Sequence, residues 1–465
     1  MPSSKQSDHC ICSSSYVFLV GFSRMFRSTL RRRGLSITFG RRRGLPITFG
    51  RRTYKVLAIE SSCDDSCIAL LEKSPSSRIP EIVDHVKTTL NSSQTGGIIP
   101  TDAHSHHQAS LSTTLQDFLA RNQNTKPDLI CCTRGPGMVG SLSAGLQLAK
   151  GLAIAWSVPL IGVHHMLGHI LVSILSKPNP PKYPFLSLLC SGGHSILVLS
   201  KSINDHRIII NTMDIAAGDS LDKCARELGF KGNMLGKELE VYINTIPNTD
   251  KKIFQATNTS DRSLNDFGLK MTLPLKKAKH RQHRDQKDKE NPIFISSNNE
   301  PIKFAFSGFL SSVRGYREHN ADELDEYTKQ FLAYKIQEML FDHILDRINF
   351  ALDRHSAAGD DLFKGVNDFI FSGGVAANKR LRTKLSEDLK YKGNFHFPSL
   401  ELCTDNAIMI GIAGIEMFEE LRLRSDLSIL PIRKWPLDEL RQMDGSDGWI
   451  NVKEEEYERV SKSNH

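Results

Sequence analysis

The sequence predicts an α/β protein with two lobes. From residue 55 onwards, short apolar runs of strand length alternate with longer segments of helix length, which is typical of α/β folds. An apolar strand that ends in Ser-Gly-Gly occurs twice, at residues 185–193 and 369–374, so the same structural device is used at two places in the chain. The 465 residues are 39% hydrophobic and 24% charged, which is enough apolar material for a sizeable core.

The first lobe is expected over residues 54–183. Residues 56–59 and 67–71 are apolar and are joined by a polar turn containing Asp64, which predicts a β-hairpin with carboxylates at its tip. The elements expected next are a strand at 129–132, a glycine-containing loop at 134–140, a helix ending near residue 156, a strand at 159–163 and a helix carrying His165 and His169.

The second lobe is expected over residues 184–440, followed by a mobile tail at 441–465. Its expected elements are a strand at 185–190, helices at about 218–228 and 322–354, a strand at 369–372, a helix from about 377, and a last helix at 404–421 with Thr404 as its N-cap. A polar insertion interrupts this lobe at about residues 250–300. Residues 276–290 of it contain seven Lys/Arg and three acids, which is typical of a solvated loop or, alternatively, of an arm that contacts nucleic-acid phosphates.

The positive charge of the chain belongs to its N-terminal segment. Residues 1–54 contain eleven Lys/Arg and one acid, Asp8, so the other 49 basic and 51 acidic side chains nearly cancel. An Arg- and Ser-rich, acid-poor leader predicts a disordered mitochondrial targeting segment over residues 1–53 and a location in the matrix. A disordered basic tail that binds nucleic acid is the alternative.

Two function classes are disfavoured by composition. No apolar run approaches the roughly 18 residues of a membrane span, so no membrane association is expected. The nine cysteines are an odd number without a Cys-x-x-Cys pair, and most lie in apolar runs, which argues for reduced thiols rather than a disulfide framework.

His165 and His169 form a candidate metal site with Asp405. The spacing i, i+4 places both imidazoles on one face of a helix, and two His plus one carboxylate leave a coordination position open. This ligand set suits zinc, iron or manganese. Met166 follows His165 where a metalloprotease helix would have Glu, which disfavours a peptidase. The alternative is that both histidines are core or surface residues whose hydrogen bonds are made within the protein and that bind no metal.

The two Ser-Gly-Gly loops indicate a nucleotide cleft, because glycine lets backbone N–H groups approach a phosphate closely. Two polar residues near them are candidates for contacts with ribose or base, namely Asp222 and Asn378. Each of them is also explained as a helix cap or a surface residue.

Taken in order, these motifs resemble the tRNA adenosine threonylcarbamoyltransferases, a branch of the actin-like ATPase (ASKHA) fold. The matching segments run from about residue 55 to 440 and lie at 58–65, 96–100, 134–140, 163–169, 191–194, 214–218, 221–223, 306–308, 372–378 and 401–406. The resemblance implies two duplicated lobes, each with a mixed β-sheet flanked by helices. Together with the leader, it implies the mitochondrial branch of the family.

The resemblance also implies an activity and its residues. Such an enzyme transfers the threonylcarbamoyl group of threonylcarbamoyl-AMP to the N6 amine of adenosine 37, in tRNAs reading codons that begin with A, and releases AMP. A separate synthase supplies the adenylate, and the organellar branch suggests a homodimer. By position, one divalent metal, zinc or iron, would be held by His165, His169 and Asp405. The adenylate would be held by Leu189, Cys190, Ser191, Gly192, Gly193, Asp222, Gly236 and Asn378.

The base that deprotonates the attacking amine does not follow from the sequence; Asp64 is the candidate, with a structural role in the turn as the alternative. Other functions compatible with this fold are a small-molecule kinase, a metal-dependent peptidase-like protein and a non-catalytic scaffold.

Overall fold

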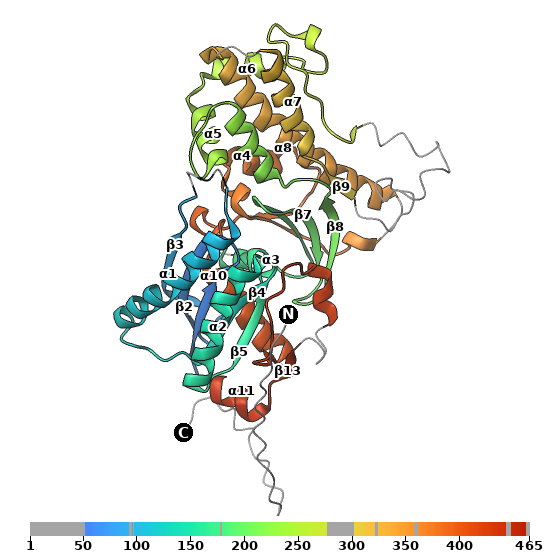
Figure 1. The fold of residues 1–465 in the computed structure, drawn as a ribbon. Coiled ribbons are helices and arrows are strands. Elements are labelled where there is room, and N and C mark those ends of the chain that lie inside the picture. Colours follow the sequence, from blue (N-terminus) through green and yellow to red (C-terminus); the bar gives the residue numbers. More distant parts are fainter. Residues whose placement is uncertain are drawn as a thin grey trace, which may run out of the picture. The chain divides into compact units, whose positions relative to one another are not determined.

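The computed structural model describes residues 52–92, 95, 97–176, 179–276, 302–320, 324–357, 361–442 and 448–461. The leader expected over residues 1–53 lies almost entirely outside this part, as do residues 277–301 of the basic insertion. Two large sheets organise the described part (Figure 1).

The first sheet has five strands. In spatial order they are β3 (Glu81–Thr89), β2 (Asp65–Lys73), β1 (Tyr54–Glu60), β4 (Leu129–Gly135) and β5 (Leu160–His164). The expected hairpin is confirmed, because β1 and β2 pair antiparallel with Glu60 opposite Cys67. Strands β1, β4 and β5 are parallel, so their carboxyl ends meet at one edge of the sheet.

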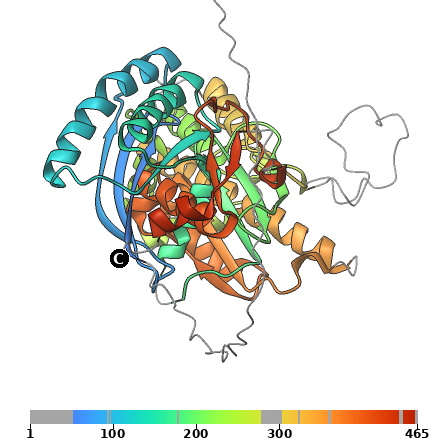
Figure 2. The same ribbon diagram turned by 90° about the horizontal axis from the view of Figure 1, so that it is seen from below.

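Helices cover both faces of this sheet. Leu57 and Ile59 of β1 pack in one apolar cluster with helices α1 (Pro100–Arg121) and α2 (Val139–Trp156). The alternating residues Val56 and Ala58 belong to a second cluster, which contains helices α3 (His165–Leu171) and α10 (Ala407–Glu416). Figure 2 shows α1 and α2, in cyan tones, along the outer side of the blue strands.

The second sheet has six strands. In spatial order they are β11 (Asn394–His396), β10 (Asp368–Ser372), β6 (Phe185–Cys190), β7 (Ser195–Ser200), β8 (His206–Thr212) and β9 (Ile302–Phe304). Its strands mix parallel and antiparallel pairs, as expected for this fold class. Ile196 and Val198 of β7 share the apolar cluster of α3 and α10, so these two helices lie between the sheets.

The other face of the second sheet is covered by a helical layer (Figure 1). Its helices are α4 (Ala217–Glu227), α5 (Leu235–Thr245), α6 (Asn248–Ala256), α7 (Ser307–His319), α8 (Glu326–Ala357) and α9 (Lys379–Asp388). The part of the polar insertion that is described is therefore partly helical, and Phe254 of α6 is fully buried in the apolar cluster.

Short elements complete the fold. They are the 3₁₀ turns η1 (Val172–Leu175), η2 (Arg262–Leu264), η5 (Asp361–Phe363), η6 (Gly374–Ala377), η7 (Leu400–Leu402) and η9 (Leu437–Gln442), the π turn η8 (Met417–Leu421), and the elements β12 (Leu423–Ser425), β13 (Trp449–Asn451) and α11 (Glu454–Ser461). Strand β13 pairs with β12, and Tyr457 of α11 is buried. Residues 448–461 of the expected tail are therefore packed into the fold.

Two further expectations can be compared with the structure. The last long helix begins at Ala407 rather than at Thr404, because the Asn406 side chain is its N-cap and accepts a hydrogen bond from the Met409 amide at 2.9 Å. All seven cysteines of the described residues are free, as expected. Within the described residues, no helix is both long enough and apolar enough to cross a membrane.

Candidate metal centre and nucleotide cleft

Three neighbouring histidines lie at the junction of β5 and α3, and the first is structural. His164 is the N-cap of α3, and its Nδ1 accepts a hydrogen bond from the Met166 amide at 3.1 Å. Its Nε2 donates to the carbonyl oxygen of Trp435 at 2.9 Å. Burial lowers the pKa of His164 to about 3, so the ring is neutral and both nitrogens are occupied.

His165 and His169 lie on the same face of α3, as predicted from their spacing. Their ring centroids are 4.8 Å apart, and both side chains are buried. The Asp405 Oδ1 atom lies 3.1 Å from His169 Nε2 and 3.6 Å from His165 Nε2. The structure therefore brings together the three predicted ligands, although 236 residues separate His169 from Asp405.

The three side chains fit a divalent metal ion. Each offers one ligand atom, and these atoms lie within 4.8 Å of one another. Among the described residues His169 Nδ1 has no hydrogen-bond partner although it is buried, so the protein itself uses only one nitrogen of this ring. Two imidazole nitrogens and one carboxylate oxygen make a three-ligand set that leaves a position open.

Glu60 holds His165 in place from behind. His165 Nδ1 donates to Glu60 Oε2 at 3.2 Å, and the Ser62 hydroxyl lies 3.1 Å from the same nitrogen. The carboxylate is fully buried and also accepts hydrogen bonds from the Ser62 amide at 2.6 Å and from the Thr133 hydroxyl. This support fixes the ring so that Nε2 faces Asp405.

The charges of the centre are strongly coupled. Burial on its own lowers the pKa of His165, but the carboxylates of Glu60 and Asp405 raise it to about 9. Burial raises the pKa of Asp405, but His165 and His169 lower it overall, so this carboxylate is ionised at neutral pH. The pKa of Glu60 is likewise lowered by His165 against the effect of burial.

Lys87 of β3 connects the hairpin to the loop before α10. Its Nζ donates to the Asp65 carboxylate at 2.7 Å, to the Thr404 hydroxyl at 3.0 Å and to the Asp405 carbonyl at 2.8 Å. Neither Lys87 nor Glu60 was predicted as a site residue. For Glu60 there was a signal, since a carboxylate at the end of an apolar strand is costly unless it is bound.

The two Ser-Gly-Gly loops lie next to each other. Strands β6 and β10 are parallel neighbours with Leu189 opposite Ser372, so both loops leave the same edge of the sheet. Gly373 has φ +93°, and a Cβ atom there would approach the Cys190 carbonyl oxygen to 2.4 Å. Gly192 and Gly193 are exposed, with open space where their side chains would be. The carboxyl ends of parallel strands are the usual place for nucleotides in open α/β sheets.

Asp222 and Gly236 meet near these loops. The Gly236 amide donates to Asp222 Oδ1 at 2.6 Å, and burial raises the pKa of Asp222. The start of α4, the helix of Asp222, is joined to the first loop because the Gly218 amide donates to the Ser191 carbonyl at 3.1 Å. The loop 189–193, Asp222 and Gly236 thus occupy one region of the second lobe.

Asn378 and Asp64 have well-defined structural surroundings. The Asn378 side chain caps α9 by accepting from the Leu381 amide, and it donates to the Gln337 side chain at 3.0 Å, so the structure gives it the role of a helix cap. Asp64 lies at the tip of the hairpin, where burial and the adjacent Asp65 raise its pKa. Asp405 also contributes to this rise, which places Asp64 within electrostatic range of the metal centre.

Two known proteins have sequences similar to most of this chain. The chain is 35% identical over 416 residues to the mitochondrial tRNA N6-adenosine threonylcarbamoyltransferase of Schizosaccharomyces pombe, covering 86% of this chain and 90% of that protein. It is 34% identical over 368 residues to the tRNA N6-adenosine threonylcarbamoyltransferase of Kosmotoga olearia, covering 78% of this chain and 93% of that protein.

A solved structure and a family model also match. Component A of the (R)-2-hydroxyglutaryl-CoA dehydratase of Acidaminococcus fermentans shares 11% identity with this chain and has a TM-score of 0.41, covering 79% of this chain and 100% of that one. The family model for TsaD, tRNA N6-adenosine threonylcarbamoyltransferase, matches residues 81–412. The chain therefore belongs to the TsaD family of tRNA N6-adenosine threonylcarbamoyltransferases.

Proposed function

We propose that this protein transfers the threonylcarbamoyl group from threonylcarbamoyl-AMP to the N6 amine of adenosine 37 in mitochondrial tRNAs that read codons beginning with A. The observation that carries this proposal is the convergence of His165, His169 and Asp405 in a protein whose Ser-Gly-Gly loops lie side by side at the carboxyl ends of parallel strands. The names of the two relatives support the same activity.

The reaction requires little covalent work from the protein, because the carbamoyl–phosphate anhydride is already activated. The N6 nitrogen attacks the carbamoyl carbon, the bond from that carbon to the phosphate oxygen breaks, and AMP leaves with the bonding electrons. The amine proton passes to a base. Asp64 is our candidate for this base, since its raised pKa makes it a better proton acceptor than an ordinary aspartate.

The second lobe is proposed to hold the adenylate. The backbone of residues 189–193 permits close approach of the phosphate, because Gly192 and Gly193 leave open space. Asp222 uses Oδ1 for the Gly236 amide, and its other oxygen is proposed to accept a ribose hydroxyl. Asn378 is also proposed to contact the nucleotide. Its side chain already caps α9, so the contact would be made from this fixed position at the start of the helix.

Members of this family are metal-dependent. We propose that His165, His169 and Asp405 hold a single divalent ion, with zinc or iron favoured by the ligand types. Such an ion, when bound, supplies a Lewis acid that polarises the carbamoyl group and offsets negative charge. Glu60 contributes by fixing the His165 ring, so the ligand geometry exists before the substrate arrives.

The cellular setting is also part of the proposal. The Arg-rich leader, together with the mitochondrial relative of Schizosaccharomyces pombe, supports import into the mitochondrial matrix. There the enzyme would receive the adenylate from a separate synthase and work as a homodimer on tRNA. Light scattering of the purified protein measures its oligomeric state, and a monomeric mass would contradict the dimer.

Deletion of the gene tests the function in the cell. Mitochondrial tRNA from the deletion strain should lose threonylcarbamoyladenosine, as measured by nucleoside mass spectrometry. Expression of the wild-type chain should restore it, whereas His165→Ala should not, because the metal ligand is lost. His85→Ala, which removes an exposed histidine of β3, is the matched control and should restore the nucleoside fully. An unchanged nucleoside level after deletion would refute the proposal.

A further inference from the structure

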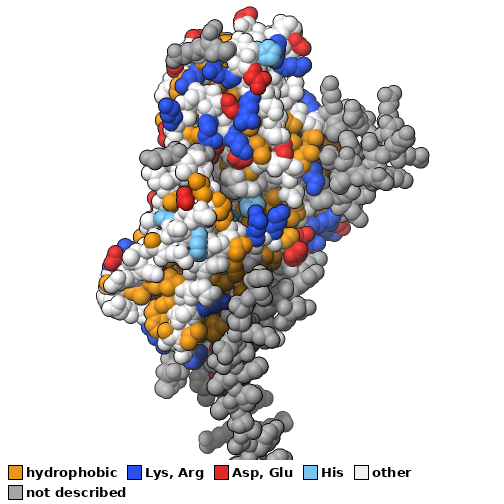
Figure 3. Space-filling model, viewed as in Figure 1, with side chains coloured by type: hydrophobic (Ala, Val, Ile, Leu, Met, Phe, Trp, Pro, Cys, Tyr) orange, Lys and Arg blue, Asp and Glu red, His pale blue; other side chains and the backbone are white. Residues whose placement is uncertain are grey.

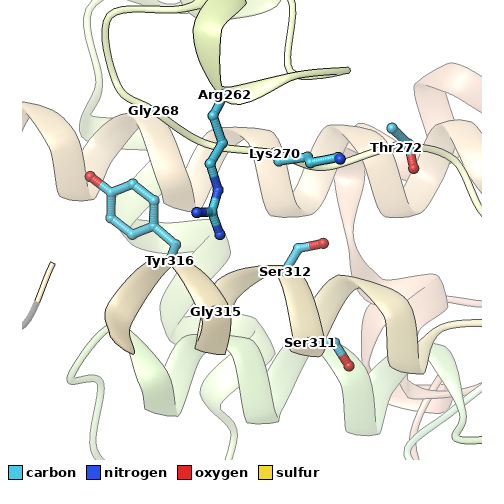
Figure 4. Close-up of a pocket in the computed structure, with 8 residues that line it drawn as sticks. All are labelled: Arg262, Gly268, Lys270, Thr272, Ser311, Ser312, Gly315 and Tyr316. Carbon is cyan, nitrogen blue, oxygen red and sulfur yellow. The ribbon is translucent and has the colours of Figure 1, made fainter. Parts of the chain in front are cut away.

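A hollow with a volume of about 270 Å³ lies between α7 and the segment of residues 262–272, which begins with η2 (Figure 4). The segment contributes Arg262, Lys270 and Thr272, and α7 contributes Ser311, Ser312 and Tyr316. None of these residues belongs to the metal centre or to the proposed adenylate site.

Two cations of this hollow are available to a ligand. Arg262 and Lys270 are exposed, and within the described part of the chain neither forms an ion pair or a hydrogen bond through its charged group. Figure 4 shows the Arg262 guanidinium pointing from the segment toward α7, while Lys270 extends toward Thr272. The pKa of Asp261 is lowered mainly by hydrogen bonds from the amide and hydroxyl of Ser263, and Lys270 makes only a smaller contribution.

The rest of the lining is polar. The Ser311 and Ser312 hydroxyls donate to helix carbonyls one turn earlier, at 3.1 and 3.0 Å. The Thr272 hydroxyl has no hydrogen-bond partner among the residues that the structure describes. Two cations that line one hollow together with hydroxyl groups match a phosphate group, to which Arg and Lys bind as strong donors. An apolar ligand would leave the Arg262 and Lys270 charges and the Thr272 hydroxyl without a partner.

An extended polyanion fits the position of the hollow better than a small phosphate compound does. The hollow lies on the outer side of α7, and α7 packs against α4, the helix of Asp222. Figure 3 shows Lys and Arg side chains, with some acidic ones between them, on the surface formed by helices α5 to α8. Because the chain beyond residue 54 has 49 basic and 51 acidic side chains, it can bind a polyanion only through local groups of cations such as this one.

We propose that this hollow, formed by Arg262, Lys270 and Thr272 against α7, binds backbone phosphates of the tRNA substrate while the anticodon reaches the metal centre. The inference rests on the proposed function, since it assumes that tRNA is the substrate. It assigns an affinity role to residues that take no part in the chemistry. Phosphate contacts of this kind position the nucleic acid without reading its sequence.

Binding of an unmodified tRNA transcript to the full chain tests the hollow directly. Each phosphate contact contributes about 0.7 to 0.9 to the magnitude of the slope of log affinity against log salt concentration. Arg262→Ala and Lys270→Ala should therefore each reduce the slope by about 0.7 to 0.9. At 0.1 M salt, each variant should bind tRNA about five- to eightfold more weakly. Arg262→Lys should retain most of the affinity because the charge remains. Lys364→Ala, which removes a lysine whose side chain is 77% exposed and lies outside the hollow, is the matched control.

The results separate this inference from the proposed function. If both alanine variants bind tRNA with wild-type affinity and salt slope, the hollow is not a phosphate site. A loss of AMP affinity in these variants, with tRNA affinity unchanged, would also overturn the inference, because the hollow would then belong to the nucleotide site. A wild-type protein that binds tRNA but transfers no threonylcarbamoyl group would refute the proposed function, whereas the binding comparison would still decide the role of the hollow.

Discussion

Glu60 Oε2 lies 3.2 Å from His165 Nδ1, on the opposite side of the imidazole from the nitrogen that faces Asp405. A buried carboxylate at the end of β1 therefore orients a ring at the start of α3, across 105 residues of sequence. His169 has no equivalent partner for its Nδ1 among the described residues. The two proposed histidine ligands are thus held unequally, because only His165 has a second partner that fixes its ring.

Glu60→Ala should weaken metal binding without removing a ligand. The change leaves His165 Nδ1, the Ser62 amide and the Thr133 hydroxyl without their shared acceptor. Loss of such a supporting carboxylate typically lowers metal affinity about 10- to 100-fold. Glu60→Gln keeps an oxygen acceptor for His165 and should lose less metal affinity than Glu60→Ala. Titration of the metal-free protein with zinc measures both values, and wild-type affinity in Glu60→Ala would contradict the role assigned to Glu60.

Metal affinity should rise with pH. The pKa of His165 is raised to about 9, so at neutral pH the metal-free ring holds a proton that a metal must displace. Affinity should therefore increase about tenfold per pH unit from pH 6.5 to about 9 and then level off. The raised pKa also affects the stability of the metal-free protein. Protonated His165 stabilises the folded state fully below about pH 6.5, and this contribution is lost as the pH rises through about 9. Competition with a chromophoric chelator gives the profile, and a flat profile would show that His165 is neutral before the metal binds.

Gly373→Ala should destabilise the second lobe. Its φ of +93° disfavours any side chain, and the added Cβ would approach the Cys190 carbonyl oxygen to 2.4 Å. Backbone strain of this kind costs about 1–3 kcal/mol before the steric clash is counted. Urea unfolding measures the difference. Gly193→Ala is the control, because its Cβ meets no atom within 4 Å, and it should unfold like the wild type. If both variants lose the same unfolding free energy, the contact of residue 373 with Cys190 is not the cause of the destabilisation.

Asp222→Asn should reduce nucleotide affinity while preserving the fold. An amide oxygen can still accept the Gly236 N–H, but the charge that strengthens a bond to a ribose hydroxyl is lost. Hydrogen bonds to charged groups contribute about 1.5–3 kcal/mol, so AMP should bind about 10- to 100-fold more weakly in calorimetry. Asp219→Asn, an acid of the same helix that pairs with Lys223, should bind AMP normally. If the two variants behave alike, Asp222 does not contact the nucleotide.

Much of the architecture could be predicted because it depends on local patterns. Strand-length apolar runs predicted the β1–β2 hairpin, and the i, i+4 spacing predicted that His165 and His169 share one face. The repeated Ser-Gly-Gly predicted two related strand ends, which the structure shows to be adjacent. The two-lobed α/β class followed from these patterns, whereas the actin-like fold was implied only by the resemblance to the family.

Other features depend on contacts that local patterns do not contain. Thr404 and Asn406 both suit an N-cap, and Asn406 takes this position while the Thr404 hydroxyl is held by Lys87. Glu60 was visible as a charged residue next to an apolar strand, but its partner His165 comes from a different element. The hollow at α7 joins residues 262–272 to residues 311–316, which are far apart in the sequence, so no motif marks it.

Transfer in vitro tests the central claim most directly. The purified protein is incubated with a threonylcarbamoyl-AMP synthase, threonine, bicarbonate, ATP and an unmodified tRNA transcript, with and without a metal chelator. We predict that mass spectrometry detects threonylcarbamoyladenosine, that the chelator abolishes it, that added metal restores it, and that His169→Ala yields none. Transfer that persists in the chelator and in His169→Ala would contradict the metal centre, and failure of the wild-type protein to modify tRNA under any of these conditions would contradict the proposed function itself.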